Sequence, residues 1–139
     1  MREILFRGKR KDNGKWFYGS YLFLNIPPHD WTGEEHGNPS ETHFIIDEHD
    51  INYAVDPATV GQFTGLTDKN GKKIFDGDIA RGYYGETEYQ NEVLFVEEGF
   101  ALRLNHHKYG CCAALSEIED AEVIGNIYDN PELLYHDHH

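Results

Sequence analysis

Residues 56–79 read D-P-A-T-V-G-Q-F-T-G-L-T-D-K-N-G-K-K-I-F-D-G-D-I and hold the densest run of turn signals in the chain. Asp-Pro at 56–57, Asn-Gly at 70–71 and Asp-Gly at 76–77 each favour a turn, because these residue types suit the backbone angles that turns require. Asn-Gly at 70–71 predicts a hairpin, either with a type I′ turn or with a left-handed Gly beside a bulge. Closely spaced turns between short apolar pieces predict a small, strongly bent sheet.

Upstream of this stretch, two pairs of strands are expected. Residues 2–7 and 15–24 lie on either side of Asp-Asn-Gly at 12–14, and this pattern predicts an N-terminal β-hairpin. The second run is rich in aromatic residues and is expected to be a core strand. Residues 42–46 and 51–55 predict a further pair of strands, joined by a polar turn.

Downstream, residues 78–80, 91–96 and 100–104 predict a meander of strands, and 121–128 alternates as a closing strand would. Residues 81–90 are expected to form a pliant tip, because they contain two Gly. Such a meander is typical of a small barrel. The prediction is a mainly β chain with little helix, in which an SH3-like small barrel in the second half has the N-terminal hairpin packed alongside.

Helix is expected only as single turns. Residues 57–60 predict one turn that Asp56 caps, since Pro favours the first helical position. Residues 113–120 predict a short helix or 3₁₀ turn, and 131–134 predict a last turn.

Three blocks of sequence together resemble one known family. They are the opening R-E-I-L-F-R-G-K-R with G-K-W-F-Y-G, the central V-G-Q-F-T-G-L-T-D-K-N-G-K-K-I-F-D-G-D-I, and the closing E-V-I-G-N-I-Y-D-N-P-E-L-L. In this order they resemble the signature of the YopX-type family of small phage and prophage proteins. The resemblance spans most of the chain but not residues 27–50 or the tail after Leu134. It implies a largely β fold and a phage or prophage origin, and it implies no established activity and no catalytic residue.

The length and the charge of the chain exclude several classes of protein. The chain has 139 residues and a formal net charge of −13. Its length favours one domain, expected over residues 1–134, followed by a loose C-terminal tail at 135–139. The negative charge disfavours a general nucleic-acid binder, which needs clustered Lys and Arg. No apolar run approaches a membrane span, so a cytoplasmic location in the bacterial host is expected.

Two segments carry the candidate binding residues. Residues 25–41 are rich in Pro and Gly and predict a long loop, and long loops in compact domains are often functional. Trp31 in this loop needs either a core pocket or a partner. The second segment is the 81–90 tip. The residues predicted to bind a partner are Trp31, Tyr83, Tyr84 and Tyr89.

Several His, Cys and Asp residues are candidates for metal binding or nucleophilic chemistry, but structural roles are preferred for them. His106, His107, Cys111 and Cys112 are the main zinc candidates, but adjacent ligands on a strand point to opposite faces and do not easily share one metal. The adjacent cysteines indicate no disulfide framework. The calcium-like spacing from Asp68 fails because Lys72 occupies a ligand position, so turn formation is the preferred interpretation. We expect no cofactor, no metal and no catalytic residue.

The sequence therefore predicts a phage or prophage accessory protein that is not an enzyme and that binds a host or phage protein. An acidic inhibitor that mimics DNA and a metal-dependent hydrolase are the alternatives. A nucleic-acid contact through Arg7, Lys9, Arg10 and Lys11 is a further possibility, although a solvated hairpin tip is favoured for these cations. The partner and the oligomeric state, including a homo-oligomer, stay open.

Overall fold

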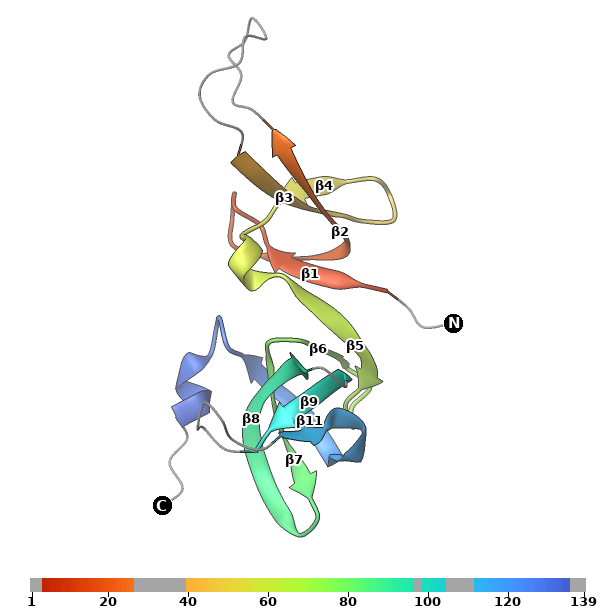
Figure 1. The fold of residues 1–139 in the computed structure, drawn as a ribbon, viewed down its shortest axis with the longest axis vertical. Coiled ribbons are helices and arrows are strands. Elements are labelled where there is room, and N and C mark those ends of the chain that lie inside the picture. The colour runs from red at the N-terminus through yellow and green to blue at the C-terminus, as the bar shows by residue number, and fades with distance from the viewer. Residues whose placement is uncertain (1–3, 27–39, 97–98, 105–111, 136–139) are drawn as a thin grey trace, which may run out of the picture. The chain divides into compact units, whose positions relative to one another are not determined.

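The computed structural model describes residues 4–26, 40–96, 99–104 and 112–135 (Figure 1). Its strands form two antiparallel sheets, and its described helices are three short 3₁₀ turns, so the expected mainly β fold with little helix is confirmed. The chain divides into two compact units, Leu5–Val60 and Gly61–His139 together with Met1–Ile4. We call them the N-terminal unit and the C-terminal unit. The single domain expected over 1–134 stays a prediction.

The N-terminal unit contains four antiparallel strands in the spatial order β4-β3-β2-β1. They are β1 (Phe6–Lys9), β2 (Trp16–Ile26), β3 (Ser40–Ile46) and β4 (Asn52–Ala54). The expected N-terminal hairpin is confirmed, with Phe6 opposite Gly19 and Lys9 opposite Trp16. The turn η1 (Pro57–Thr59) follows, and the Asp56 side chain caps it by accepting the Ala58 amide at 3.0 Å.

The centre of the N-terminal unit is small. Ile45 and Val55 are fully buried, and aromatic side chains of β2 and β4 pack against one another on the same sheet. The Phe17 and Tyr53 rings meet edge to face with centroids 4.9 Å apart, and the Arg10 guanidinium lies 3.4 Å from the centroid of Tyr53. Because aromatic and cation–π pairs add to plain burial of area, they support a core that has few aliphatic side chains.

The C-terminal unit begins with a hairpin of β5 (Gly61–Thr67) and β6 (Lys73–Phe75). A five-stranded sheet follows, with the order β10-β9-β8-β7-β11. Its strands are β7 (Asp78–Tyr84), β8 (Thr87–Val96), β9 (Gly99–Arg103), β10 (Cys112–Ala114) and β11 (Glu119–Asn126). The short turns are η2 (Leu115–Glu117) and η3 (Pro131–Tyr135).

The core of this unit joins all its parts. Its buried apolar side chains come from β6, from strands β7 to β10 and from the segment around η2. They are Ile74, Ala80, Val93, Leu102, Ala113, Leu115 and Ile118. The meander of β7, β8 and β9 and the return of β11 beside β7 agree with the sequence prediction. Within the described residues, β10 and β11 are the two ends of an open sheet, so the SH3-like barrel is not confirmed.

The turn at Asn70-Gly71 is the second of the two types expected. Gly71 has a φ of +84°, whereas Asn70 does not have a positive φ. The pairing of β5 with β6 also shifts register between Phe63 and Thr67. A left-handed Gly beside an irregular pairing is the bulged hairpin rather than the type I′ turn.

The carboxylate of Asp68 ties this hairpin to the last strand. Its Oδ1 accepts the amides of Asn70 at 2.8 Å and Lys72 at 2.9 Å, and its Oδ2 accepts the amide of Val123 at 2.9 Å. The Lys69 amide also donates to the carbonyl of Ala121 at 2.8 Å. Burial raises the pKa of Asp68, but the three amide hydrogen bonds outweigh burial and lower it. Residues 55 positions apart in sequence are thereby held together.

The prediction that residues 81–90 form a pliant tip is wrong. β7 and β8 pair through most of it, with Arg81 opposite Gln90 and Tyr83 opposite Glu88, and the turn is confined to residues 85–86. Tyr and Thr residues are good strand formers, and their cross-strand pairing outweighs the two glycines. The tip is a two-stranded extension of the sheet.

Replacing Asp68 with Asn should lower the free energy of unfolding by about 2–4 kcal/mol, because a buried carboxylate that accepts three amides becomes a neutral amide with one acceptor oxygen. The folded-state pKa is lowered, so the stabilisation is complete above about pH 4 and is lost as the pH falls through the lowered pKa. Urea unfolding of both proteins across this range measures the difference. A difference that stays constant down to the lowest pH would contradict the role of the charge.

Replacing Gly19 with Ala should destabilise the chain by about 1–3 kcal/mol, because an added Cβ would lie 2.1 Å from the backbone oxygen of Ile46. This is the close approach of backbone that a Gly inside a strand indicates. The matched control is Ser20→Ala, at the exposed next position, which should change stability by less than about 0.5 kcal/mol. Thermal unfolding of both variants measures the effect, and equal melting temperatures would contradict it.

Candidate functional site

Two adjoining pockets on the C-terminal unit form the candidate site. Their volumes are about 310 and 340 Å³, and both are lined by Lys69 and Asp120. We call the two pockets together the groove. One of them, which we call the apolar pocket, has apolar side chains over about half of its lining. The other, the charged pocket, is lined mostly by charged side chains, so the groove offers two different kinds of contact side by side.

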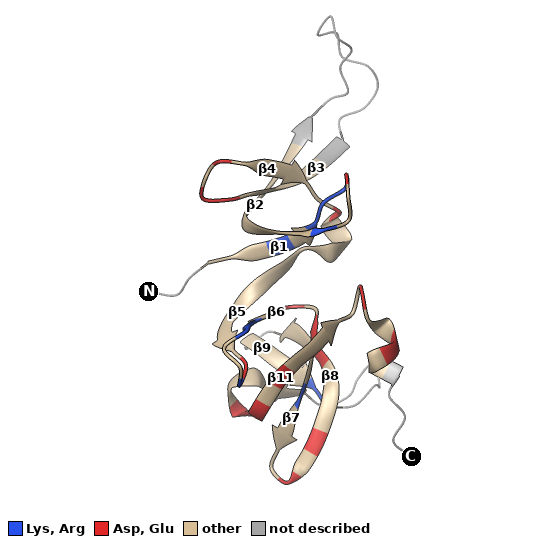
Figure 2. Cartoon of the chain, turned by 180° about the vertical axis from the view of Figure 1, so that it is seen from behind, with Lys and Arg blue, Asp and Glu red and all other residues tan. Residues whose placement is uncertain are grey.

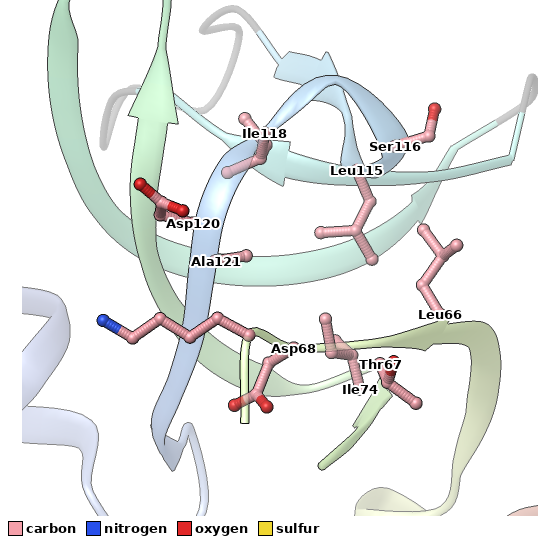
Figure 3. Close-up of a pocket in the computed structure, with 10 residues that line it drawn as sticks. Leu66, Thr67, Asp68, Ile74, Leu115, Ser116, Ile118, Asp120 and Ala121 are labelled. Atoms are coloured by element: carbon pink, nitrogen blue, oxygen red, sulfur yellow. The ribbon is translucent and has the colours of Figure 1, made fainter. Parts of the chain in front are cut away.

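The apolar pocket lies between the β5–β6 hairpin and the segment that leads from η2 into β11 (Figure 3). Ile74 and Leu115 are 1% and 3% exposed, whereas Leu66 is 37% exposed at the edge. Ile118 and Ala121 complete the apolar part of the lining. The polar part comes from Thr67, Asp68, Lys69, Ser116 and Asp120. The hydrogen bonds of the Asp68 carboxylate, which we call the Asp68 tie, position the two walls because they join the β5–β6 hairpin to β11.

The charged pocket is lined from β7, β8 and β11 by Arg81, Gly82, Tyr83, Glu88 and Glu122, with Lys69 and Asp120. Arg81 Nη2 lies 3.1 Å from Glu122 Oε1, and Lys69 Nζ lies 3.7 Å from the same oxygen. Both cations of the pocket are therefore paired with one carboxylate.

Two carboxylates of this pocket lack such a pairing. Within the described part of the chain, Glu88 and Asp120 have no ion-pair partner. Figure 2 shows the acidic positions on β8 and β11 that include them. The groove therefore has an excess of negative charge beside its apolar pocket, and a cation is the ligand group that this charge favours.

Asp120 reaches the groove because β11 is bulged. The pairing of β11 with β7 shifts register between Glu119 and Glu122, and Asp120 has a φ of 55°. Asp is one of the few residue types other than Gly that tolerate this left-handed conformation. Bulges re-aim side chains and are frequent beside functional sites. Here the bulge puts Asp120 among the residues that line both pockets.

The structure separates the three tyrosines that the sequence singled out. Tyr83 lines the charged pocket and is 40% exposed. Tyr84 is 41% exposed, but successive side chains on a strand point to opposite faces, so it projects away from Tyr83. Tyr89 is opposite Gly82 and packs against the core cluster. Trp31 lies outside the described residues.

A second apolar surface was missed by the sequence analysis. The expectation that residues 15–24 form a core strand is wrong in its last part, since Leu22, Phe23 and Leu24 are 42%, 53% and 43% exposed. We call residues 22–24 with their partners 42–44 on β3 the ribbon. The register of β1 covers β2 only from Trp16 to Gly19, so the ribbon extends past it. A run of aromatic and aliphatic residues longer than the neighbouring strand is the signal that could have indicated this exposure.

The basic residues near the N-terminus do not form a single exposed patch. Arg7 is 5% exposed, and its guanidinium lies 4.5 Å from the centroid of the Trp16 ring. Arg10 makes two hydrogen bonds to the Asp12 carboxylate, at 2.9 and 2.6 Å, and this hydrogen bonding lowers the pKa of Asp12. The Lys9 ammonium lies 5.5 Å from the centroid of the same Trp16 ring. With three of the four proposed cations engaged, a nucleic-acid contact at this site gains no support.

The candidates for metal and thiol chemistry lie mostly outside the described residues. His106, His107 and Cys111 belong to that part, and Cys112 is exposed on β10. No group of three or more His, Cys, Asp or Glu side chains that could hold a metal ion occurs within ranges 4–26, 40–96, 99–104 and 112–135. Asp68, the first position of the calcium-like spacing, instead accepts backbone amides, as a turn former does.

Comparisons with known proteins concern the fold and the family. The family model described as "YopX protein" matches residues 5–135. The crystal structure of protein EF1440 from Enterococcus faecalis is similar, with a TM-score of 0.51 and 22% identity over 96% of this chain and 99% of that one. No curated protein matches the chain. None of the helices in the described residues is long and apolar enough to cross a membrane.

Substitutions at Asp120 should separate conformation from charge. Asp120→Asn should leave the free energy of unfolding within about 0.5 kcal/mol, because Asn tolerates a positive φ as Asp does. Asp120→Val should destabilise by about 1–2 kcal/mol, because a β-branched residue fits this conformation poorly. Chemical unfolding of both variants measures the two effects. Equal stability of the Val and Asn variants would show that the bulge does not hold this backbone angle.

Proposed function

The chain belongs to the YopX family, and from this premise we propose that it is a phage or prophage accessory protein that binds a host or phage protein and catalyses no reaction. The observation that carries the proposal is the groove, where the apolar pocket adjoins the exposed ring of Tyr83 and two carboxylates, Glu88 and Asp120, that have no ion-pair partner among the described residues. Protein-binding sites commonly combine an apolar centre with a polar rim, and Tyr is enriched in them.

The groove has features suited to holding a protein segment. Its walls are strands and short turns fixed by the Asp68 tie, so little ordering is needed when a partner binds. Tyr83 offers a large ring with few rotatable bonds at the edge of the charged pocket. We further propose that the second half of the chain forms an SH3-like small barrel with the N-terminal hairpin alongside. We also propose that the protein acts in the cytoplasm of the bacterial host.

An acidic inhibitor that mimics DNA is the second candidate. Glu86, Glu88, Glu119 and Asp120 are exposed along β8, its turn and β11, where they could face a basic groove on a nucleic-acid enzyme (Figure 2). Binding of this type should fall steeply as salt rises and should be competed by DNA. The metal-dependent hydrolase predicted as another alternative has one direct test, which is a metal analysis of the purified chain for stoichiometric zinc.

The proposal is tested with a photoreactive amino acid placed at position 83 or at position 84 of the full chain. The two native tyrosines are 40% and 41% exposed but project from opposite faces, so they form a matched pair. In host cells with and without phage infection, position 83 should crosslink one stoichiometric protein and position 84 should not. Tyr83→Ala should weaken binding of that protein about tenfold or more, and Tyr84→Ala less than twofold.

Each other outcome has a definite meaning. Crosslinking from position 23 on the ribbon but not from position 83 would move the binding site and contradict the groove. A partner that DNA displaces would favour the mimic. The absence of any crosslink from both surfaces, with folded protein in the cells, would contradict the binding module.

A further inference from the structure

We propose that the groove binds an extended segment of its partner that carries a Lys or Arg two positions from an aliphatic residue. This inference rests on the proposed function and names the chemistry of the partner. It follows from the charge of one pocket, the apolar lining of the other, and the residue that joins them.

The charge of the groove selects a cation. Arg81 and Lys69 are both engaged with Glu122, at 3.1 and 3.7 Å, so this carboxylate offsets one of their two positive charges. Glu88 and Asp120 add two negative charges, so the pocket holds three carboxylates against two cations. Glu88 and Asp120 lie on the same pocket with no ion-pair partner among the described residues. A Lys or Arg side chain in the charged pocket would supply that partner, whereas a carboxylate or a phosphate there would be repelled.

The adjoining pocket selects an aliphatic side chain. Leu66, Ile74, Leu115 and Ile118 supply its apolar lining, and Leu66 is the exposed member. A Leu or Ile that enters this pocket removes apolar surface from water on both sides, which is the main favourable term in such contacts. Its volume of about 310 Å³ is sufficient for one side chain of this size.

Asp120 links the two requirements in one segment. Because it lines both pockets, a bound cation must lie close to the bound aliphatic group. In an extended chain, residues i and i+2 point to the same face and are about 7 Å apart. One extended segment therefore satisfies both pockets with a short basic and aliphatic pair, and the bulge that aims Asp120 sets this spacing.

Charge also decides against two other occupants. A second copy of this chain would bring a formal charge of −13 toward a groove that already has unpaired carboxylates. DNA or RNA would bring phosphates toward the same carboxylates. A basic segment of another protein has the complementary sign.

The test is a random peptide display library panned against the full chain and, in parallel, against Glu88→Lys. Peptides enriched on the natural chain should share a Lys or Arg two positions from Leu, Ile or Val. Glu88→Lys should lose these peptides or enrich acidic ones. For one enriched peptide, fluorescence polarisation should show about two- to fivefold weaker binding with Asp120→Asn and with Glu88→Gln.

The controls separate local charge from net charge. Glu86→Gln makes the same charge change in the 85–86 turn, away from the residues that line the groove, and should change affinity less than 1.5-fold, well below the shift expected of a groove contact. Leu66→Ala should weaken the peptide about three- to tenfold through the apolar pocket. Enriched peptides that are acidic or uniformly apolar would overturn the inference, and so would the absence of any enriched peptide. Displacement of the bound peptide by spermidine, added at the same concentration of positive charge as the peptide, would overturn it as well.

The outcomes also distinguish this inference from the proposed function. If position 83 crosslinks a protein but basic and aliphatic peptides do not bind, the binding module stands and the occupant named here is wrong. If neither is seen, both are wrong.

Discussion

The structure of the C-terminal unit depends on one buried carboxylate. Asp68 accepts amides from Asn70 and Lys72 within its own turn and from Val123 on the last strand. A carboxylate accepts several hydrogen bonds at once, so one side chain can both close a hairpin and fix it to a distant strand. The walls of the apolar pocket come from these two segments, and the groove exists because this tie holds them at a fixed separation.

The groove also shows how an irregular strand can carry function on a sheet. A regular β11 would alternate its side chains strictly between the two faces of the sheet. The bulge at Glu119 to Glu122 breaks the alternation and puts Asp120 among the residues that line both pockets. The left-handed backbone there has a modest conformational cost, and Asp is a residue type that limits it.

The two units expose apolar side chains in different ways. In the C-terminal unit, a cluster of apolar side chains is buried, whereas Leu66 is at the edge of a pocket and Phe95 is 61% exposed. In the N-terminal unit, the ribbon exposes Leu22, Phe23 and Leu24 on consecutive positions, hence on both faces of β2. Adjacent exposed apolar residues are a common mark of an interaction surface. The ribbon is therefore the natural competitor of the groove in any mapping of a partner.

The sequence by itself determined the turns, the strands between them and the family, because Asn-Gly, Asp-Pro and Asp-Gly pairs and alternating apolar residues act over a few positions. It identified Tyr83 but grouped it with Tyr84 and Tyr89, which the sheet separates. It interpreted residues 81–90 as a tip and 22–24 as core, because local composition does not reveal which neighbour a strand pairs with or how far that neighbour extends. Only the tertiary structure decided that Asp68 reaches Val123 and that Asp120 joins two pockets, since those contacts depend on strand register and on a bulge set by residues far away in sequence.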